Sequence, residues 1–137
     1  MTPREMASTH AAAFTQPRPW TTDEFASLLE NRFIHIVGDA GCFALFQAIA
    51  GEAELLTVAT HPTVQRQGLA LQIMHQWHEQ AAALHSTRAF LDVAADNFAA
   101  IALYKRCGYW QCGLRKGYYL RETGPKIDAL VMERHLP

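Results

Sequence analysis

The middle of the chain alternates between strand-like and helix-like segments, and this alternation limits the fold more than any other feature. Residues 52–60 have an extended pattern that ends at His61-Pro62, since proline removes a ladder donor. A helix over 68–84 and a strand over 89–94 follow. Two strands joined by one helix run parallel, and the crossover is almost always right-handed. The sequence therefore predicts a β-α-β unit at the centre of a mixed α/β sheet.

Shorter elements flank this unit on both sides. Apolar spacing and turn residues predict helices at 5–14, 23–30 and 97–107, and strands at 32–37, 42–50, 109–118 and 127–134. We expect Thr22 and Asn97 to cap two of the helices and Gly108 to end the last one. The predicted order is α-α-β-β-β-α-β-α-β-β, with antiparallel hairpins around the central unit.

Length and composition favour one domain over residues 1–137. The net charge of -1 argues against a nucleic-acid groove or a membrane surface as partner. Cys42, Cys107 and Cys112 are odd in number and lack zinc-site spacing, so we expect free thiols in a cytoplasmic protein. His75 and His78 have no third ligand nearby and are interpreted as a polar helix face, so no metal site is predicted.

The connection before the long helix has the features of an anion site. A helix start presents unpaired N–H groups, and Gly68 lets an anion approach its amide closely. Ala70 keeps that approach open, and the Gln65 side chain is a further donor. On this local pattern alone, an ordinary connection remains the alternative. The position at the carboxyl end of a central strand favours a diphosphate.

At this point the sequence resembles the GNAT superfamily of N-acetyltransferases. Gln65, Gly68 and Ala70 match the Gln/Arg-x-x-Gly-x-Gly/Ala loop of that family. Residues 91–104, Leu-Asp-Val-Ala-Ala-Asp-Asn-Phe-Ala-Ala-Ile-Ala-Leu-Tyr, are similar to its Leu-Glu-Val-x-x-x-Asn-x-x-Ala-x-x-Leu-Tyr segment. The resemblance extends from about Phe14 to the C-terminus.

Two further segments are similar to the RimI-type ribosomal-protein-alanine N-acetyltransferases. They are residues 115–119, Arg-Lys-Gly-Tyr-Tyr, followed by the Asp-Ala-Leu-Val-Met of 128–132, and the early Pro19-Trp20. This resemblance implies a protein N-terminus as acceptor and a peptide pocket shaped by Trp20, Tyr118 and Tyr119. Since side chains alternate along a strand, we expect only one of the two tyrosines to face the pocket.

The resemblance also implies the fold and the acetyl donor. The fold is a mostly antiparallel sheet with a splayed central parallel pair, and the donor is acetyl-CoA. The family's first strand would precede residue 5, so we expect a sheet without that edge strand. The residues implied to bind coenzyme A are Val58, Ala59, Thr60, Gln65, Arg66, Gln67, Gly68, Leu69, Ala70, Asn97 and Tyr104.

The catalytic groups implied are an acid and a base. Tyr104 is the expected acid for the departing thiolate, on the helix face that also carries Asn97. Asp92 matches the family's glutamate, one methylene shorter, and is the candidate base, with a bridging water suited to its shorter side chain. Glu54 on the adjacent strand is a rival, and His61 is interpreted as a loop residue.

The amine acceptor stays open at this stage. A RimI-type enzyme acts on a protein N-terminus, whereas other family members would use a lysine side chain, a polyamine or a small-molecule amine. A third alternative is an acyl-CoA-binding module without turnover, which the shorter Asp92 keeps in consideration.

Overall fold

The computed structural model describes residues 1–13, 19–121 and 123–137, and its elements follow the predicted order. They are α1 (Pro3–Ala13), α2 (Thr22–Glu30), β1 (Ile34–Asp39), β2 (Cys42–Ile49), β3 (Glu52–Thr60), the 3-10 turn η1 (Pro62–Val64), α3 (Leu69–Ala83), β4 (Arg88–Ala94), α4 (Phe98–Arg106), β5 (Trp110–Tyr119) and β6 (Ile127–His135). None of these helices is long and apolar enough to cross a bilayer.

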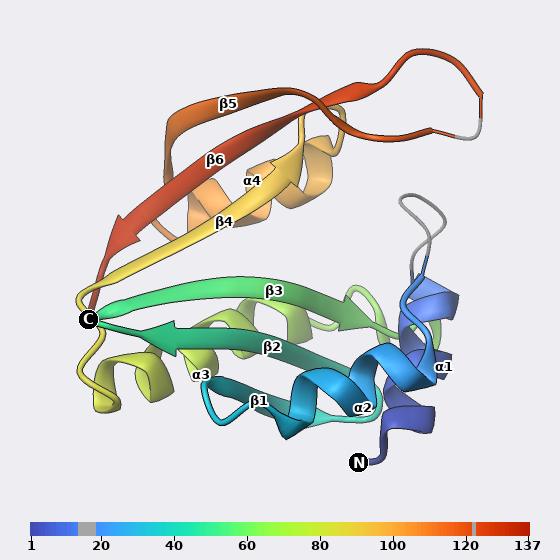
Figure 1. Ribbon diagram of the computed structural model, residues 1–137, viewed down its shortest axis with the longest axis vertical. Helices are drawn as coiled ribbons and strands as arrows, with labels where there is room; N and C mark the ends of the chain where they lie inside the picture. Colours follow the sequence, from blue (N-terminus) through green and yellow to red (C-terminus); the bar gives the residue numbers. More distant parts are fainter. Residues whose placement is uncertain (14–18, 122) are drawn as a thin grey trace.

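The strands of the described chain form one sheet in the order β1-β2-β3-β4-β6-β5. All neighbours pair antiparallel except β3 and β4, which are parallel at the centre. Their pairing joins only Glu52–Glu54 to Arg88–Phe90, after which the two strands diverge toward their carboxyl ends (Figure 1). The predicted splay is confirmed, and it separates the sheet into a β1-β2-β3 half and a β4-β6-β5 half.

Strand β2 is buried on both faces, which explains its continuous apolar sequence. Ala44 and Phe46 pack into the main core with α3, α4 and the facing strands. Phe43 and Leu45 point to the other face and pack against α1 and α2. Figure 1 shows α1 at the open end of the sheet, where β3 finishes, and α2 running from there in front of β1 and β2. The two N-terminal helices are thereby held beside the opening between the halves.

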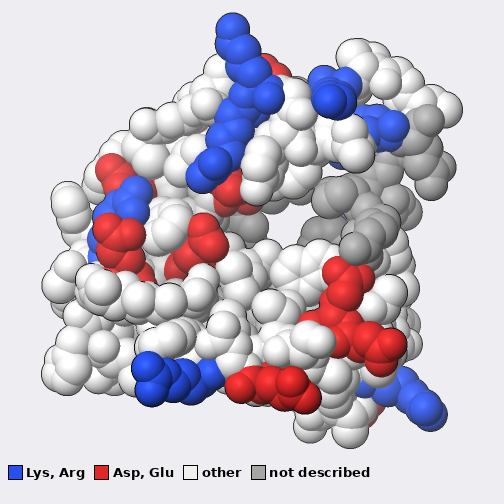
Figure 2. Space-filling view, viewed as in Figure 1, with Lys and Arg blue, Asp and Glu red and all other residues white. Residues whose placement is uncertain are grey.

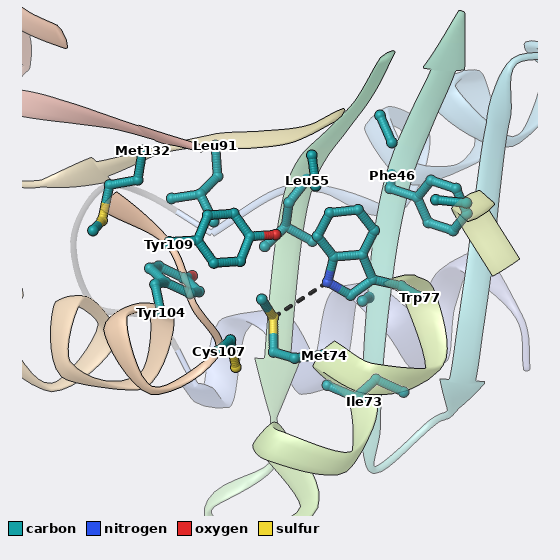
Figure 3. Packing of buried hydrophobic residues seen from close by; sticks show 14 of the residues in the cluster. Phe46, Leu55, Ile73, Met74, Trp77, Leu91, Tyr104, Cys107, Tyr109 and Met132 are labelled. Atoms are coloured by element: carbon teal, nitrogen blue, oxygen red, sulfur yellow. Dashed lines mark hydrogen bonds between the residues drawn. The ribbon is translucent and has the colours of Figure 1, made fainter. Parts of the chain in front are cut away.

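The main core is centred on Trp77 of α3, which is fully buried together with Met74 (Figure 3). The Trp77 Nε1–H donates to the Met74 sulfur at 3.2 Å. The prediction that His78 belongs to a polar face was wrong, because its side chain is buried and its Nε2 lies 2.6 Å from the Tyr109 hydroxyl. Positions 74, 77, 78 and 81 share one face of a helix, so His78 enters the core with its apolar neighbours.

Local capping moved several predicted boundaries. Thr21, not Thr22, is the N-cap of α2: its side chain accepts from the Glu24 amide, and the Glu24 carboxylate accepts from the Thr21 amide. Strand β1 begins two residues later than predicted, because Asn31 at the end of α2 accepts the Phe33 N–H and forms a turn. The predicted end of the first helix at Phe14 and the segment 16–18 lie outside the described residues.

Candidate active site

A cavity of about 660 Å³ lies where the two halves of the sheet diverge. This volume is typical of small-molecule sites. The space-filling view shows the molecular surface hollowed between the halves, with acidic and basic side chains around the hollow (Figure 2). The walls come from α1, β3, β4, α4, β5 and the segments before α2, between β4 and α4, and after β5: His10, Trp20, Glu54, Leu55, Leu56, Thr57, Val58, Leu91, Asp92, Val93, Ala94, Asp96, Asn97, Tyr104, Arg115, Tyr118, Tyr119 and Arg121.

The structure brings many of the predicted site residues together at this cavity and leaves others elsewhere. Those in the walls are Trp20, Glu54, Val58, Asp92, Asn97, Tyr104, Tyr118 and Tyr119. Ala59 is instead buried in the core beneath α1 and α2. The Thr60 hydroxyl lies 3.4 Å from the Cys42 sulfur. Residues 65–70 lie before and within the first turn of α3, outside the cavity walls.

Tyr104 reaches the cavity from α4 and is 7% exposed. Burial raises the pKa of its hydroxyl, and Tyr119 and Cys107 raise it further. The hydroxyl therefore stays protonated at neutral pH and can act as a proton donor. The start of α4 is held by Asn97, whose side-chain oxygen accepts from the Ala100 N–H at 3.2 Å, as predicted for an N-cap.

Two carboxyl groups, Glu54 on β3 and Asp92 on β4, line the same cavity. Burial raises the pKa of Glu54, and the nearby Asp92 raises it further, while Arg115 opposes the shift. Asp92 is ion-paired with the Arg115 Nε at 3.3 Å. Glu54 thus holds a proton more tightly than an ordinary glutamate does. His61 caps the turn after β3, where its Nδ1 accepts the Thr63 N–H, and it is a loop residue as predicted.

Tyr118 and Tyr119 both line the cavity, so the expectation that only one would face it was wrong. Their rings are in edge contact, with centroids 5.1 Å apart. The pairing of β5 with β6 shifts register between Arg115 and Tyr119, and Gly117 there has a φ of 58°. This irregularity breaks the strict alternation of side chains on which the expectation depended. Burial and then Asp92 raise the pKa of Tyr119 to about 12.

His10 is a wall residue that no sequence pattern indicated. Its ring is buried and stacks on Trp20 with centroids 5.1 Å apart. Burial lowers the pKa of His10 to about 4, so the ring is neutral at pH 7. Because Nδ1 accepts the Trp20 N–H at 3.0 Å, the ring hydrogen is on Nε2, which donates to the Thr57 hydroxyl at 3.1 Å. His10 therefore ties Trp20 to the middle of β3.

Arg121 is a second wall residue that the sequence did not indicate. It follows the end of β5, its side chain is 10% exposed, and its Nη2 donates to the Asp96 carboxylate at 2.8 Å. A single arginine near a predicted turn usually belongs to the solvated surface. Its bond to Asp96 joins the segment after β5 to the segment after β4, a contact that local sequence patterns do not reveal.

The predicted anion loop has an open backbone at the start of α3. Gly68 is the N-cap with a φ of 76°, and no side chain of the described residues caps this helix start. Apart from Gly68, its chain neighbours and the adjacent helix backbone, no described heavy atom lies within 4 Å of the place where a Cβ on Gly68 would be. The Gln65 side chain donates to the Thr60 carbonyl at 3.0 Å and so closes the loop. The first-turn amides of α3 are consequently accessible to a phosphate group.

The cysteines and histidines add no further site. Within the described residues all three cysteines are unpaired, as predicted, and burial raises the pKa of the Cys42 and Cys107 thiols. No group of three or more metal-ligating side chains comes together in the part of the chain that the structure describes.

Comparison with known proteins gives consistent matches. The model of the family described as Acetyltransferase (GNAT) family matches residues 5–109. The ribosomal protein bS18-alanine N-acetyltransferase of Escherichia coli K12 is 32% identical over 118 residues, 83% of this chain and 79% of the relative. The N-alpha-acetyltransferase RimI of Mycobacterium tuberculosis is 30% identical over 137 residues, 93% of this chain and 83% of the relative. The crystal structure of the Escherichia coli ribosomal-protein-S18-alanine N-acetyltransferase superimposes with a TM-score of 0.86 at 27% identity, covering 98% of this chain and 87% of that one.

Proposed function

The chain belongs to the GNAT acetyltransferase family, and on that premise we propose that it acetylates the N-terminal α-amine of a protein, most specifically of a ribosomal protein. That it is an acetyl-CoA-dependent N-acetyltransferase follows from the family and from the fold. The choice of a protein N-terminus rests on the similarity to RimI-type enzymes together with a cavity walled by Trp20, Tyr118 and Tyr119. Three unpaired cysteines fit the reducing cytoplasm, where we place the reaction.

The residues at the splay and at the start of α3 fit acetyl-CoA. The open amides of Gly68, Leu69 and Ala70 suit its diphosphate, since the helix start is uncapped and a side chain is absent at Gly68. Beyond Glu54, the edge of β3 that faces β4 has no strand partner among the described residues, so its backbone can bind the pantetheine amides. When bound, acetyl-CoA supplies a thioester that a neutral amine can attack.

The Glu54–Asp92 pair is our proposed acceptor of the amine proton. A base works best when its pKa lies near the working pH. Burial and the charge of Asp92 raise the pKa of Glu54, and Asp92 itself is ion-paired with Arg115. We therefore assign the proton to Glu54, directly or through water, and give Asp92 the role of sustaining the raised pKa.

Tyr104 is our proposed acid. Its side chain lines the cavity on the α4 side, and its hydroxyl is protonated at neutral pH, so it can donate a hydrogen bond and then a proton to the departing thiolate.

Release of free thiol from acetyl-CoA, measured with three acceptors, tests this function. The acceptors are a hexapeptide that starts with alanine, the same peptide with a blocked N-terminus and one lysine, and spermidine. We expect steady release only with the first. Turnover only with the lysine peptide or spermidine contradicts the N-terminal acceptor, and acetyl-CoA binding without any release contradicts the enzyme and favours a binding module.

A further inference from the structure

Arg121 is a charged group of the cavity that the proposed mechanism does not use. Its side chain is nine-tenths buried, and its Nη2 is occupied by Asp96. The neighbouring Nη1 is buried and donates to no described residue. A buried guanidinium nitrogen without an acceptor destabilises the protein. A ligand group that accepts its hydrogens removes this cost, and the free energy recovered favours binding. Because Arg121 lines the cavity, a rotation of its guanidinium would present the covered Nη1 to an acceptor bound there.

The charges around the cavity indicate what kind of acceptor fits. Arg121 and Arg115 are each paired with an aspartate, Asp96 and Asp92 respectively. Glu54 has no ion pair with a described residue. A carboxylate ligand would therefore meet no uncompensated positive charge and would add a negative charge near Glu54. A neutral carbonyl oxygen accepts the Nη1 hydrogens without that repulsion.

A peptide acceptor carries such a carbonyl close to its reacting amine. Only two bonds separate the α-amine nitrogen from the first carbonyl carbon. A lysine ε-amine is followed by four methylene groups, and polyamines have no carbonyl at all. Arg121 shares the cavity wall with Trp20, Tyr118 and Tyr119, on the side where the acceptor is proposed to enter. The peptide carbonyl that can accept the Nη1 hydrogen therefore lies within the first two residues of the bound peptide.

We propose that Arg121 is a specificity-determining residue whose Nη1 donates a hydrogen bond to a main-chain carbonyl within the first two residues of the acceptor peptide. This inference rests on the proposed N-terminal acceptor and deepens it. Asp96 serves as a positioning residue that orients the guanidinium and balances its charge. The site in this way selects an amine that is followed by a peptide bond.

Steady-state kinetics of Arg121→Met with two acceptors tests the proposal. One acceptor is the alanine-starting hexapeptide, and the other is propylamine, which has no carbonyl. A lost hydrogen bond from a charged donor corresponds to a roughly ten- to hundred-fold rise in KM for the peptide. The kcat for the peptide and the kcat/KM for propylamine should change less than about three-fold. Arg121→Lys keeps the charge beside Asp96 but not the two-pronged guanidinium donor. Its KM for the peptide should lie between those of the unaltered protein and Arg121→Met.

Thioamide peptides make the test independent of the stability of the variant, because they are used with the unaltered protein as well. Sulfur at the first or the second carbonyl weakens the acceptor while leaving the amine unchanged. With the unaltered protein, we expect one of these peptides to have a higher KM than the ordinary hexapeptide. With Arg121→Met, the same thioamide and the ordinary hexapeptide should have equal KM values. Arg88→Met, at an ion pair outside the cavity walls, is the matched control and should leave both values of KM unchanged.

The outcomes separate this inference from the proposed function. Turnover of the hexapeptide by the unaltered protein, with an unchanged KM in Arg121→Met, overturns the role of Arg121 alone. An equal loss with hexapeptide and propylamine also overturns it, because it indicates a structural role. If the unaltered protein turns over neither the hexapeptide nor its thioamides, the proposed function fails and this inference fails with it.

Discussion

Acidification should destabilise this protein through two buried histidines, His10 and His78. Burial lowers the pKa of His10 to about 4 and the pKa of His78 to about 3, from an unfolded value of 6.5. Arg134 and His75 lower the pKa of His78 further. Both rings are neutral in the folded protein at pH 5, whereas the unfolded chain binds protons there. The contribution of each ring is complete above pH 6.5 and is lost as the pH falls from 6.5 toward the folded pKa.

The magnitude follows from the width of that interval. Each pH unit below 6.5 lowers the free energy of unfolding by about 1.4 kcal/mol per histidine. At pH 5 each ring therefore lowers it by about 2 kcal/mol. Glu54 opposes this change, because its raised pKa gives a contribution that grows as the pH falls. Two such losses are large beside the roughly 5–15 kcal/mol that stabilise a typical domain.

His78→Gln isolates one histidine without altering the cavity walls. Urea unfolding followed by tryptophan fluorescence at pH 7, 6 and 5 gives the free energy of unfolding of each protein. The glutamine weakens the core at every pH, but it has no proton to gain. We expect the unaltered protein to lose about 2 kcal/mol more than the variant between pH 7 and pH 5. Parallel curves of stability against pH would refute the neutral burial of His78.

Three further predictions concern the site. Tyr104→Phe should lower kcat by roughly a hundred-fold or more, while calorimetry finds the affinity for acetyl-CoA nearly unchanged; full activity at every pH contradicts the acid role. Gly68→Gln should weaken acetyl-CoA binding far more than Gly68→Ala, because both substitutions share the strain of a positive φ and only the longer side chain reaches the phosphate; equal affinities would argue against the loop. Asp92→Asn should move the acidic limb of the profile of kcat/KM against pH to lower pH, since it removes a charge that raises the pKa of Glu54, whereas Glu54→Gln should abolish that limb; a limb that survives Glu54→Gln assigns the base elsewhere.

Much of the fold and part of the site could be read from local patterns. The β-α-β unit at the centre, the Asn97 cap and the left-handed Gly108 depend on residues within a few positions of one another. Motif positions indicated Tyr104 and Asp92, and the adjacent strand indicated Glu54; all three line the cavity. Even the misplaced cap at Thr22 was a local matter, because the Thr-x-x-Glu spacing belongs to Thr21.

The remaining features were decided by contacts between distant parts of the chain. His10 reaches Thr57 across 47 positions, His78 reaches Tyr109 across 31, and Arg121 reaches Asp96 across 25. Periodicity and capping depend on residues within about one helical turn or one strand pair. They therefore do not predict which elements contact each other in the fold. The tertiary structure decides which polar side chains are buried, which N–H groups lack an acceptor and which pKa values shift. It does so because β3 and β4 diverge at the centre of the sheet and the terminal segments pack around the cavity between them.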